Sequence, residues 1–115
     1  MKVVIDFDGT ITANPDFFRH LVYLLYKNEV QIYILSAAKL ERNITSDLIK
    51  WGITPVAISL MEPHNSDWKK QMQWKIAKVK AYEADIWIDN DFKMWDRIFQ
   101  VDVKKALPKT TIIQI

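Results

Sequence analysis

Short apolar runs alternate with longer amphipathic segments along the whole 115-residue chain. The apolar runs are rich in β-branched residues, and most of them end at a polar residue. This pattern is typical of strands that are buried on both faces of a parallel sheet. It predicts strands over residues 3–5, 30–35, 55–60, 84–89 and 110–115.

Between these strands, apolar residues recur at helical spacing and the segment ends carry capping residues. Asn14 is a predicted N-cap with Pro15 at the first helical position, Gly52 is a predicted C′ residue, and Ser66 or Asp67 caps a third helix. The pattern predicts helices over residues 14–29, 38–53, 65–83 and 91–99. The expected apolar positions are Phe17, Leu21, Leu24 and Leu25, then Leu40, Ile44, Leu48 and Ile49, then Trp68, Met72, Ile76 and Val79.

Strands that alternate with helices from end to end predict right-handed crossovers and a parallel sheet with helices on both faces. Half of the residues are hydrophobic, which is ordinary for a globular chain, and the length accommodates one domain. We therefore expect a single α/β sandwich over residues 1–115.

Composition narrows the function classes only a little. The net charge of +2 does not by itself indicate a nucleic-acid partner. The chain has no cysteine, which excludes disulfides and thiolate chemistry and agrees with a reducing compartment such as the cytoplasm. No signal-peptide pattern opens the chain and no apolar run is long enough to span a bilayer, so we expect a soluble protein with no membrane partner.

Polar residues follow several predicted strands at the point where each strand ends. Asp6 and Asp8 end the first strand, Ser36 the second and Asp89 the fourth, and a polar loop at residues 65–67 follows the third. Parallel strands place such ends at one ligand-binding edge. Asp6 and Asp8 can face one site there because they are two residues apart, while Phe7 turns into the core. Two acids this close repel each other unless a cation binds them or one of them holds a proton, and Mg²⁺ is a cation that prefers oxygen ligands.

The sequence DFDGT at residues 6–10 resembles the first motif of the haloacid dehalogenase-like phosphatase superfamily. IYILS, which ends at Ser36, resembles its second motif, and IWIDND at residues 86–91 resembles its acidic fourth motif. The order of motifs matches over essentially the whole chain. The resemblance implies a Rossmann-like three-layer α/β/α sandwich with parallel strand order 3-2-1-4-5. We expect no cap domain in this chain, because the segments between the motifs leave no room for one.

The superfamily's third motif is a lysine, for which this chain offers several candidates: Lys69, Lys70, Lys75, Lys78 and Lys80. Residues 69–91 also resemble the corresponding segment of phage polynucleotide kinase phosphatase domains. That register selects Lys69, with Lys70 second and Lys75 third.

The resemblance implies a mechanism in which Asp6 is the nucleophile and forms an aspartyl-phosphate, while Asp8 is the general acid and base. Ser36 and Lys69 are then expected to bind the phosphate oxygens. Further substrate-binding positions are Gly9, Thr10, Ala37 and Lys70. The expected ligands of Mg²⁺ are Asp6, Asp89 and the main-chain carbonyl of Asp8.

The fourth motif departs from the superfamily pattern, because Asn90 stands where many relatives have a second acid. Asp89 is the preferred metal ligand since it lies at the strand end. The alternative is Asp91, with Asp96 as its partner at helical spacing.

These features predict a Mg²⁺-dependent phosphomonoester hydrolase with an open site. An open site suits nucleic-acid ends or other bulky phosphates, although a small phosphate ester is an alternative substrate. Two further alternatives are a non-catalytic phosphate-binding relative and a phospho-acceptor module similar to response-regulator receivers. Receivers carry their acceptor at the end of the third strand, and PVAISL at residues 55–60 ends without an aspartate.

Overall fold

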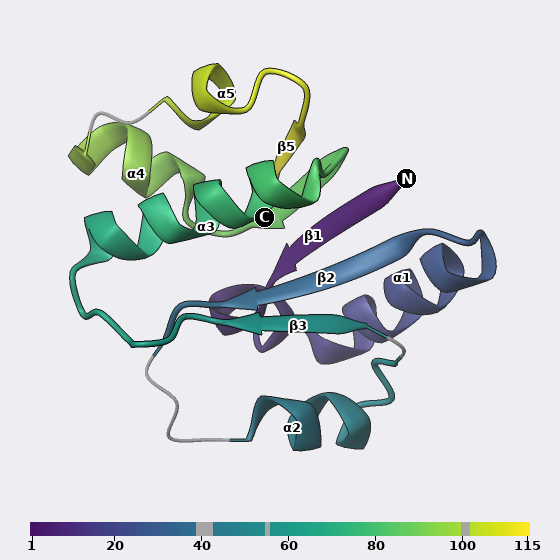
Figure 1. Ribbon diagram of the computed structural model, residues 1–115. Coiled ribbons are helices and arrows are strands. Elements are labelled where there is room, and N and C mark those ends of the chain that lie inside the picture. The colour runs from purple at the N-terminus through teal and green to yellow at the C-terminus, as the bar shows by residue number, and fades with distance from the viewer. Residues whose placement is uncertain (39–42, 55, 100–101) are drawn as a thin grey trace.

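The protein folds around one five-stranded parallel sheet with strand order β3-β2-β1-β4-β5 (Figure 1). A computed structural model describes residues 1–38, 43–54, 56–99 and 102–115. The strands are β1 (Lys2–Asp6), β2 (Gln31–Ser36), β3 (Ala57–Leu60), β4 (Ile86–Asp89) and β5 (Thr111–Gln114). The predicted fold class and strand order are confirmed.

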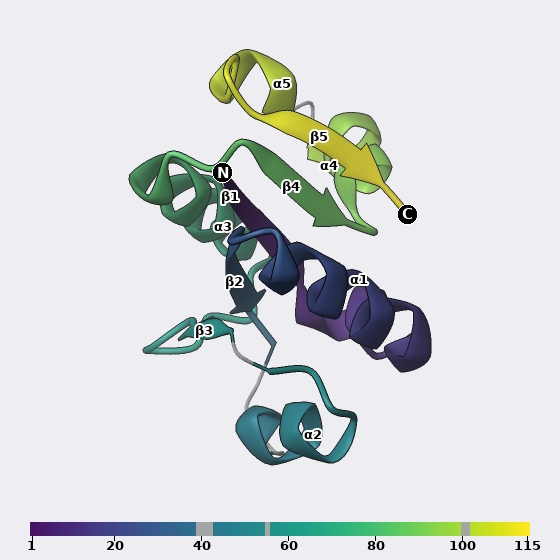
Figure 2. The same ribbon diagram turned by 90° about the vertical axis from the view of Figure 1, so that its right-hand side faces the viewer.

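Helices cover both faces of the sheet and make three layers (Figures 1 and 2). One face carries α1 (Pro15–Lys27) and α2 (Ile44–Lys50), and the other carries α3 (Trp68–Tyr82), α4 (Phe92–Phe99) and α5 (Val103–Ala106). A compact turn, η1 (Phe7–Ile11), connects β1 to α1. The hydrophobic pattern predicted neither η1 nor α5. None of the helices in the described ranges is long and apolar enough to cross a bilayer.

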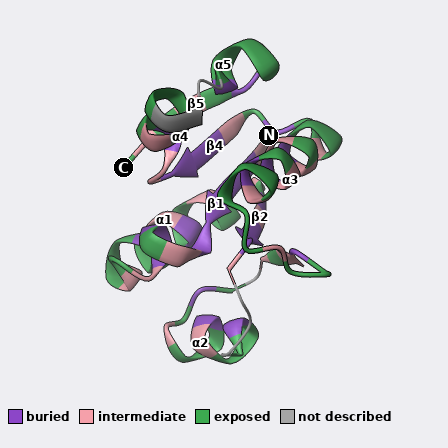
Figure 3. Ribbon diagram, turned by 90° about the vertical axis from the view of Figure 1, so that its left-hand side faces the viewer, coloured by how far each residue is buried: buried purple, intermediate pink, exposed green. Residues whose placement is uncertain are grey.

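The sheet divides the core into two clusters of buried side chains. Figure 3 shows that buried residues are concentrated on the central strands β1, β2 and β4. Val3 and Ile5 of β1 point toward α1 and α2, while Val4 points to the α3 side, as the two-residue period of a strand requires. Trp87 of β4 is the largest fully buried side chain and packs with Met72 on that second side. The central strands are therefore buried on both faces.

Several predicted helix ends are confirmed by capping contacts. The side chain of Asn14 accepts a hydrogen bond from the amide of Phe17 at 3.1 Å, and Pro15 follows it. Asp67, not Ser66, caps α3. The second helix begins at Ile44, later than predicted, with Asn43 as its N-cap. Two predicted positions, Leu40 in that helix and Pro55 in the third strand, lie outside the described residues.

Four residues that the pattern predicted to be buried are exposed instead: Phe17, Leu24, Ile49 and Trp68. In α1, Phe18 and Val22 are buried one helical turn apart. The predicted Leu21 and Leu25 are partly buried and pack against the same core cluster, so the core-facing stripe keeps these two predicted positions and replaces Phe17 and Leu24 by Phe18 and Val22. In α3 the core-facing stripe includes Met72 and Val79 but not Trp68. That helix also buries a lysine, which bears directly on the site.

Candidate functional site

The strand ends that carry polar residues lie at one edge of the sheet because all five strands are parallel. Ile5 of β1 pairs with Ile88 of β4, so that Asp6 and Asp89 come level with each other as the next residues. On the other side of β1, Asp6 pairs with Leu35, and Ser36 follows one residue later. The register therefore places Asp6 between Ser36 and Asp89.

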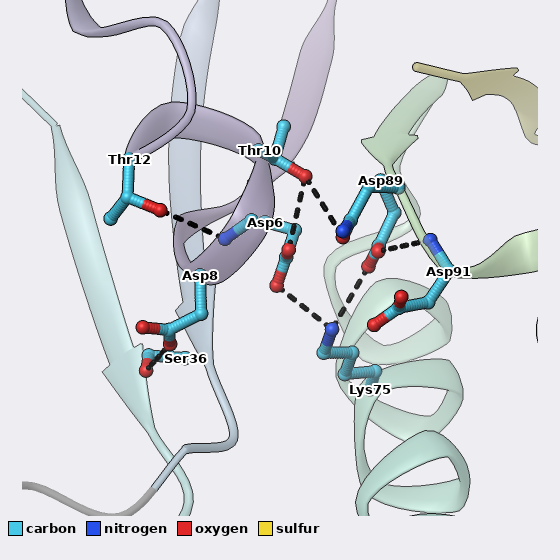
Figure 4. A network of polar contacts seen from close by, with 10 residues as sticks. Asp6, Asp8, Thr10, Thr12, Ser36, Lys75, Asp89 and Asp91 are labelled. Carbon is cyan, nitrogen blue, oxygen red and sulfur yellow. Dashed lines mark hydrogen bonds and ion pairs between the residues drawn. The ribbon is translucent and has the colours of Figure 1, made fainter.

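A single lysine from α3 bridges the two acids that end β1 and β4 (Figure 4). The Nζ of Lys75 lies 2.8 Å from Oδ1 of Asp6 and 3.0 Å from Oδ2 of Asp89. All three residues are buried, with exposed fractions of 5% for Lys75, 1% for Asp6 and 0% for Asp89. One ammonium thus faces two carboxylates away from water.

Burial shapes the protonation of these three groups. It raises the pKa of Asp6 to about 7. The charge of Asp89 adds to this rise, and Lys75 and Thr10 offset only part of it. Burial also raises the pKa of Asp89, against the lowering effect of Lys75. For Lys75, burial favours the neutral amine, but the charges of Asp6 and Asp89 outweigh it and raise the lysine pKa. The cluster therefore holds more negative charge than one ammonium neutralises.

Thr10 and Asn90 hold the other side of the acid pair. The hydroxyl of Thr10 donates to Oδ2 of Asp6 at 3.0 Å and is fully buried. The side-chain amide of Asn90 satisfies its neighbours when its nitrogen faces the two acids. In this orientation the nitrogen donates to Oδ2 of Asp6 and to Oδ1 of Asp89, both at 3.2 Å. Asn90 therefore supplies donors where the superfamily pattern has an acid.

Gly9 is needed for the close approach of η1 to Asn90. Its φ of +78° lies in the left-handed region that favours glycine. A Cβ at this position would lie 2.4 Å from the side-chain amide of Asn90, too close for any other residue without movement. The turn that follows Asp6 can pack against the end of β4 only because residue 9 is glycine.

Asp8 lies on the opposite side of Asp6 from Lys75, next to β2 (Figure 4). It is partly buried, and its Oδ2 accepts a hydrogen bond of 2.8 Å from the hydroxyl of Ser36, which is itself buried. Phe7, between the two acids, turns into the core as predicted and stacks on Trp51 with ring centroids 6.0 Å apart. The two acids of the DFDGT sequence thus meet different partners.

The structure corrects the choice of lysine. Lys69 and Lys70 are exposed in the first turn of α3, whereas Lys75 reaches the acids. Lys75 lies six residues further along the helix, ~9 Å at the usual helical rise, and shares the core-facing stripe with Met72 and Val79. The signal in the sequence was this stripe, in which a lysine occupies a position between apolar residues at helical spacing.

The remaining residues that the sequence suggested for the site differ in their contacts and burial. The hydroxyl of Thr10 holds Asp6 and is buried, and the amide of Gly9 donates to Oγ1 of Thr12 at 2.9 Å. Ala37 is buried directly after β2. The amide of Asp91 donates to Oδ1 of Asp89 at 3.1 Å. Asp96 is exposed on α4.

The acids at this edge fit a divalent cation in their chemistry. Within the described ranges, no group of three or more His, Asp or Glu side chains is placed to hold a metal ion. Mg²⁺, however, is commonly held by one or two carboxylates with water and other oxygens. Asp6 and Asp89, with the main-chain carbonyl of Asp8, would supply such a set. Burial is the main cause of the raised pKa of both acids, and neighbouring carboxylates add to it, so a bound cation would favour their ionised forms.

A pocket of about 230 Å³ opens beside the buried lysine. Its lining residues come from α3, from α4 and from the loop before α4: Trp68, Gln71, Lys75, Asp91 and Met94. Because Lys75 both lines the pocket and contacts Asp6, the pocket adjoins the acid cluster. It is a place where part of a ligand could lie next to Asp6.

Comparisons with protein-family models, with curated proteins and with solved structures found no match to this chain. Inferences about its function therefore rest on the site itself and on the motifs.

Proposed function

We propose that the protein is a Mg²⁺-dependent phosphomonoester hydrolase that works through an aspartyl-phosphate on Asp6. The observation that carries the proposal is the buried bridge from Lys75 to Asp6 and Asp89. A buried ion cluster of this kind contributes little to stability, since desolvation costs about as much as the charges gain. Acids with strongly shifted pKa values in a site that adjoins a pocket are instead typical of catalytic centres.

In the first step, a carboxylate oxygen of Asp6 forms a bond to phosphorus while the bond from phosphorus to the leaving oxygen breaks. Asp8 gives its proton to that leaving oxygen. In the second step, water attacks phosphorus and gives a proton to Asp8. The bond from phosphorus to Asp6 then breaks, which releases inorganic phosphate and restores both carboxyl groups.

The neighbouring residues orient these two acids. Lys75 and Thr10 each contact one oxygen of Asp6 and so fix the plane of its carboxylate. The hydroxyl of Ser36 donates to Asp8. On this proposal, the hydroxyl turns its one proton from Asp8 to a phosphate oxygen when substrate enters. A magnesium ion held by Asp6, Asp89 and the Asp8 carbonyl would neutralise charge on the phosphate.

The resemblance and the short connections between the motifs favour an open site for the end of a nucleic acid or another bulky phosphate. Only η1 and α1 separate β1 from β2.

The test is release of phosphate from p-nitrophenyl phosphate in the presence of Mg²⁺. Asp6→Asn should reduce turnover by at least about 1,000-fold, because a carboxamide is a poor nucleophile. Asp16→Asn is the matched control, since Asp16 is exposed on α1 and its carboxylate pairs with Arg19 rather than with the acid cluster. Full turnover by Asp6→Asn would refute the proposal, and a stable phosphorylated protein without turnover would favour a phospho-acceptor module.

A further inference from the structure

Trp68 lines the pocket beside Lys75 but is not part of the hydrophobic core. Trp68 is the first residue of α3, and 55% of its surface is exposed. Burial of that helix against the sheet is achieved by Met72 and Val79. An exposed tryptophan forgoes the large stabilisation that burying its ring would give. Its position at the edge of a pocket next to reactive groups indicates a role in binding.

The other wall suits a flat ring. Met94 of α4 lines the pocket and is partly buried. Thioethers make favourable contacts with aromatic rings, and the face of an indole stacks on planar rings. A planar group that enters the pocket would therefore meet Trp68 and Met94.

The volume limits the group to about one ring system. A cavity of roughly 150 Å³ is sufficient to hold benzene, whereas pockets for drug-sized ligands measure roughly 300–1,000 Å³. The pocket here measures about 230 Å³. One substituted ring or one small bicyclic ring fits this range.

The polar groups of the pocket select for charge. Asp91 lines it and in Figure 4 lies beside Lys75. Its carboxylate repels an anionic group and accepts hydrogen bonds from N–H or O–H groups. The amide of Gln71 is held in place, because its Nε2 donates to the carbonyl of Asn65 at 2.7 Å. Lys75 also lines the pocket, and its ammonium repels a cationic group. The group that the pocket favours is therefore neutral and carries a hydrogen-bond donor.

We propose that this pocket binds the leaving group of the substrate, and that this group carries a neutral, planar aromatic ring stacked on Trp68. The inference rests on the proposed phosphatase function, which places the phosphoryl group at Asp6, next to Lys75. A nucleobase and a phenolic ring both have this chemistry. Trp68 is a specificity residue on this account, whereas Asp6 and Asp8 carry out the reaction on any phosphomonoester that reaches them.

Equilibrium binding tests the pocket without turnover. Phenylphosphonate and butylphosphonate, which cannot be hydrolysed at the phosphorus–carbon bond, would be titrated into the full chain with Mg²⁺ by calorimetry. Trp68→Ala should weaken phenylphosphonate by about five- to fifty-fold more than it weakens butylphosphonate, the range expected for loss of one stacked ring. Trp68→Phe should restore most of the difference. Tyr26→Ala, which removes a similarly exposed ring on α1, should change neither.

The charge preference has its own comparison. The protein should bind 4-aminophenylphosphonate more tightly than 4-carboxyphenylphosphonate, and Asp91→Asn should narrow that difference. Values of kcat/KM for phenyl phosphate and for nucleoside 3′- and 5′-monophosphates show which kind of ring the pocket binds. The ring is a phenol if Trp68→Ala lowers kcat/KM most for phenyl phosphate, and a nucleobase if it lowers kcat/KM most for a nucleoside monophosphate.

The outcomes separate the two proposals. If both phosphonates bind but Trp68→Ala weakens them equally, the aromatic pocket is refuted while the phosphatase stands. If neither phosphonate binds and no phosphomonoester is hydrolysed, the proposed function fails and the pocket inference fails with it.

Discussion

The buried acids should make the stability of the metal-free protein fall as the pH rises from about 4 to 7. The pKa of Asp6 is raised from 3.8 to about 7 by burial and by Asp89. A carboxyl with a higher pKa in the folded state binds its proton more tightly there, so the folded state is favoured most below the unfolded pKa. That advantage is lost progressively as the pH rises through the folded pKa. Lys75 stays charged throughout this range because its pKa is raised.

The size of the effect follows from the shift. Each pKa unit corresponds to ~1.4 kcal/mol, so a shift of about three units is worth on the order of 4 kcal/mol between pH 4 and pH 7. Asp89, whose pKa is raised as well, acts in the same direction. Urea unfolding in EDTA, measured at half-unit steps of pH, gives the free energy of unfolding directly.

Asp6→Asn provides the decisive comparison. Asparagine has nearly the same shape but does not titrate, so the variant should lose most of this pH dependence and gain stability at pH 7 relative to the natural chain. The exposed Asp16→Asn should retain the full dependence. If Asp6→Asn and the natural chain showed parallel curves from pH 4 to 7, the account of Asp6 as a buried acid with a raised pKa would be wrong.

Three further results are expected. Lys75→Met should lower kcat/KM by at least about 100-fold in phosphate-release assays, whereas Lys69→Met should change it by less than about threefold. A larger loss in Lys69→Met than in Lys75→Met would show that Lys69, the lysine selected by the motif register, is the phosphate-binding one. Gly9→Ala should destabilise the protein by about 2–4 kcal/mol in thermal unfolding. The new Cβ would lie 2.4 Å from the Asn90 side chain, and alanine would be strained at the positive φ of this position. Gly52→Ala, where the contact is 3.3 Å to a flexible arginine side chain, should cost about 1 kcal/mol. Mg²⁺ at neutral pH should raise the melting temperature of the natural chain but not of Asp89→Asn, and an equal rise in both would remove Asp89 from the metal site.

The layers of this fold follow from the sequence pattern because each strand is a short buried run and each helix has recognisable ends. The strand order 3-2-1-4-5 follows only from the resemblance to the phosphatase superfamily. Asn14 with Pro15 and Asp67 mark helix starts through contacts that involve only nearby residues. The positions of Asp6 and Asp89 follow from the same reasoning, since the ends of parallel strands meet at one edge. Local chemistry was sufficient for these features.

The phase of each helix was harder to predict, and the errors at the site come from it. Apolar residues occur on more than one face of α1 and α3, so the pattern alone does not show that Phe18 rather than Phe17 is buried, or that Trp68 is exposed. The register of the resemblance to phage polynucleotide kinase phosphatase domains selects Lys69 ahead of Lys75, and a buried lysine is too rare for the pattern alone to favour one. Its burial depends on two acids from distant strands, which only the tertiary structure brings to it.

The orientation of Asn90 and the need for Gly9 are also tertiary effects. Both depend on the contact between η1 and the end of β4, residues about 80 positions apart in the chain. No local pattern signals that contact.

Chemical trapping of the intermediate tests the central claim most directly. A phosphatase reaction quenched with borohydride reduces an aspartyl-phosphate to homoserine, which peptide mass spectrometry locates in the chain. We predict homoserine at position 6, dependent on substrate and Mg²⁺, and none in Asp6→Asn. Steady turnover with modification at another residue, or turnover that persists in Asp6→Asn, would contradict the assignment of Asp6 as the nucleophile.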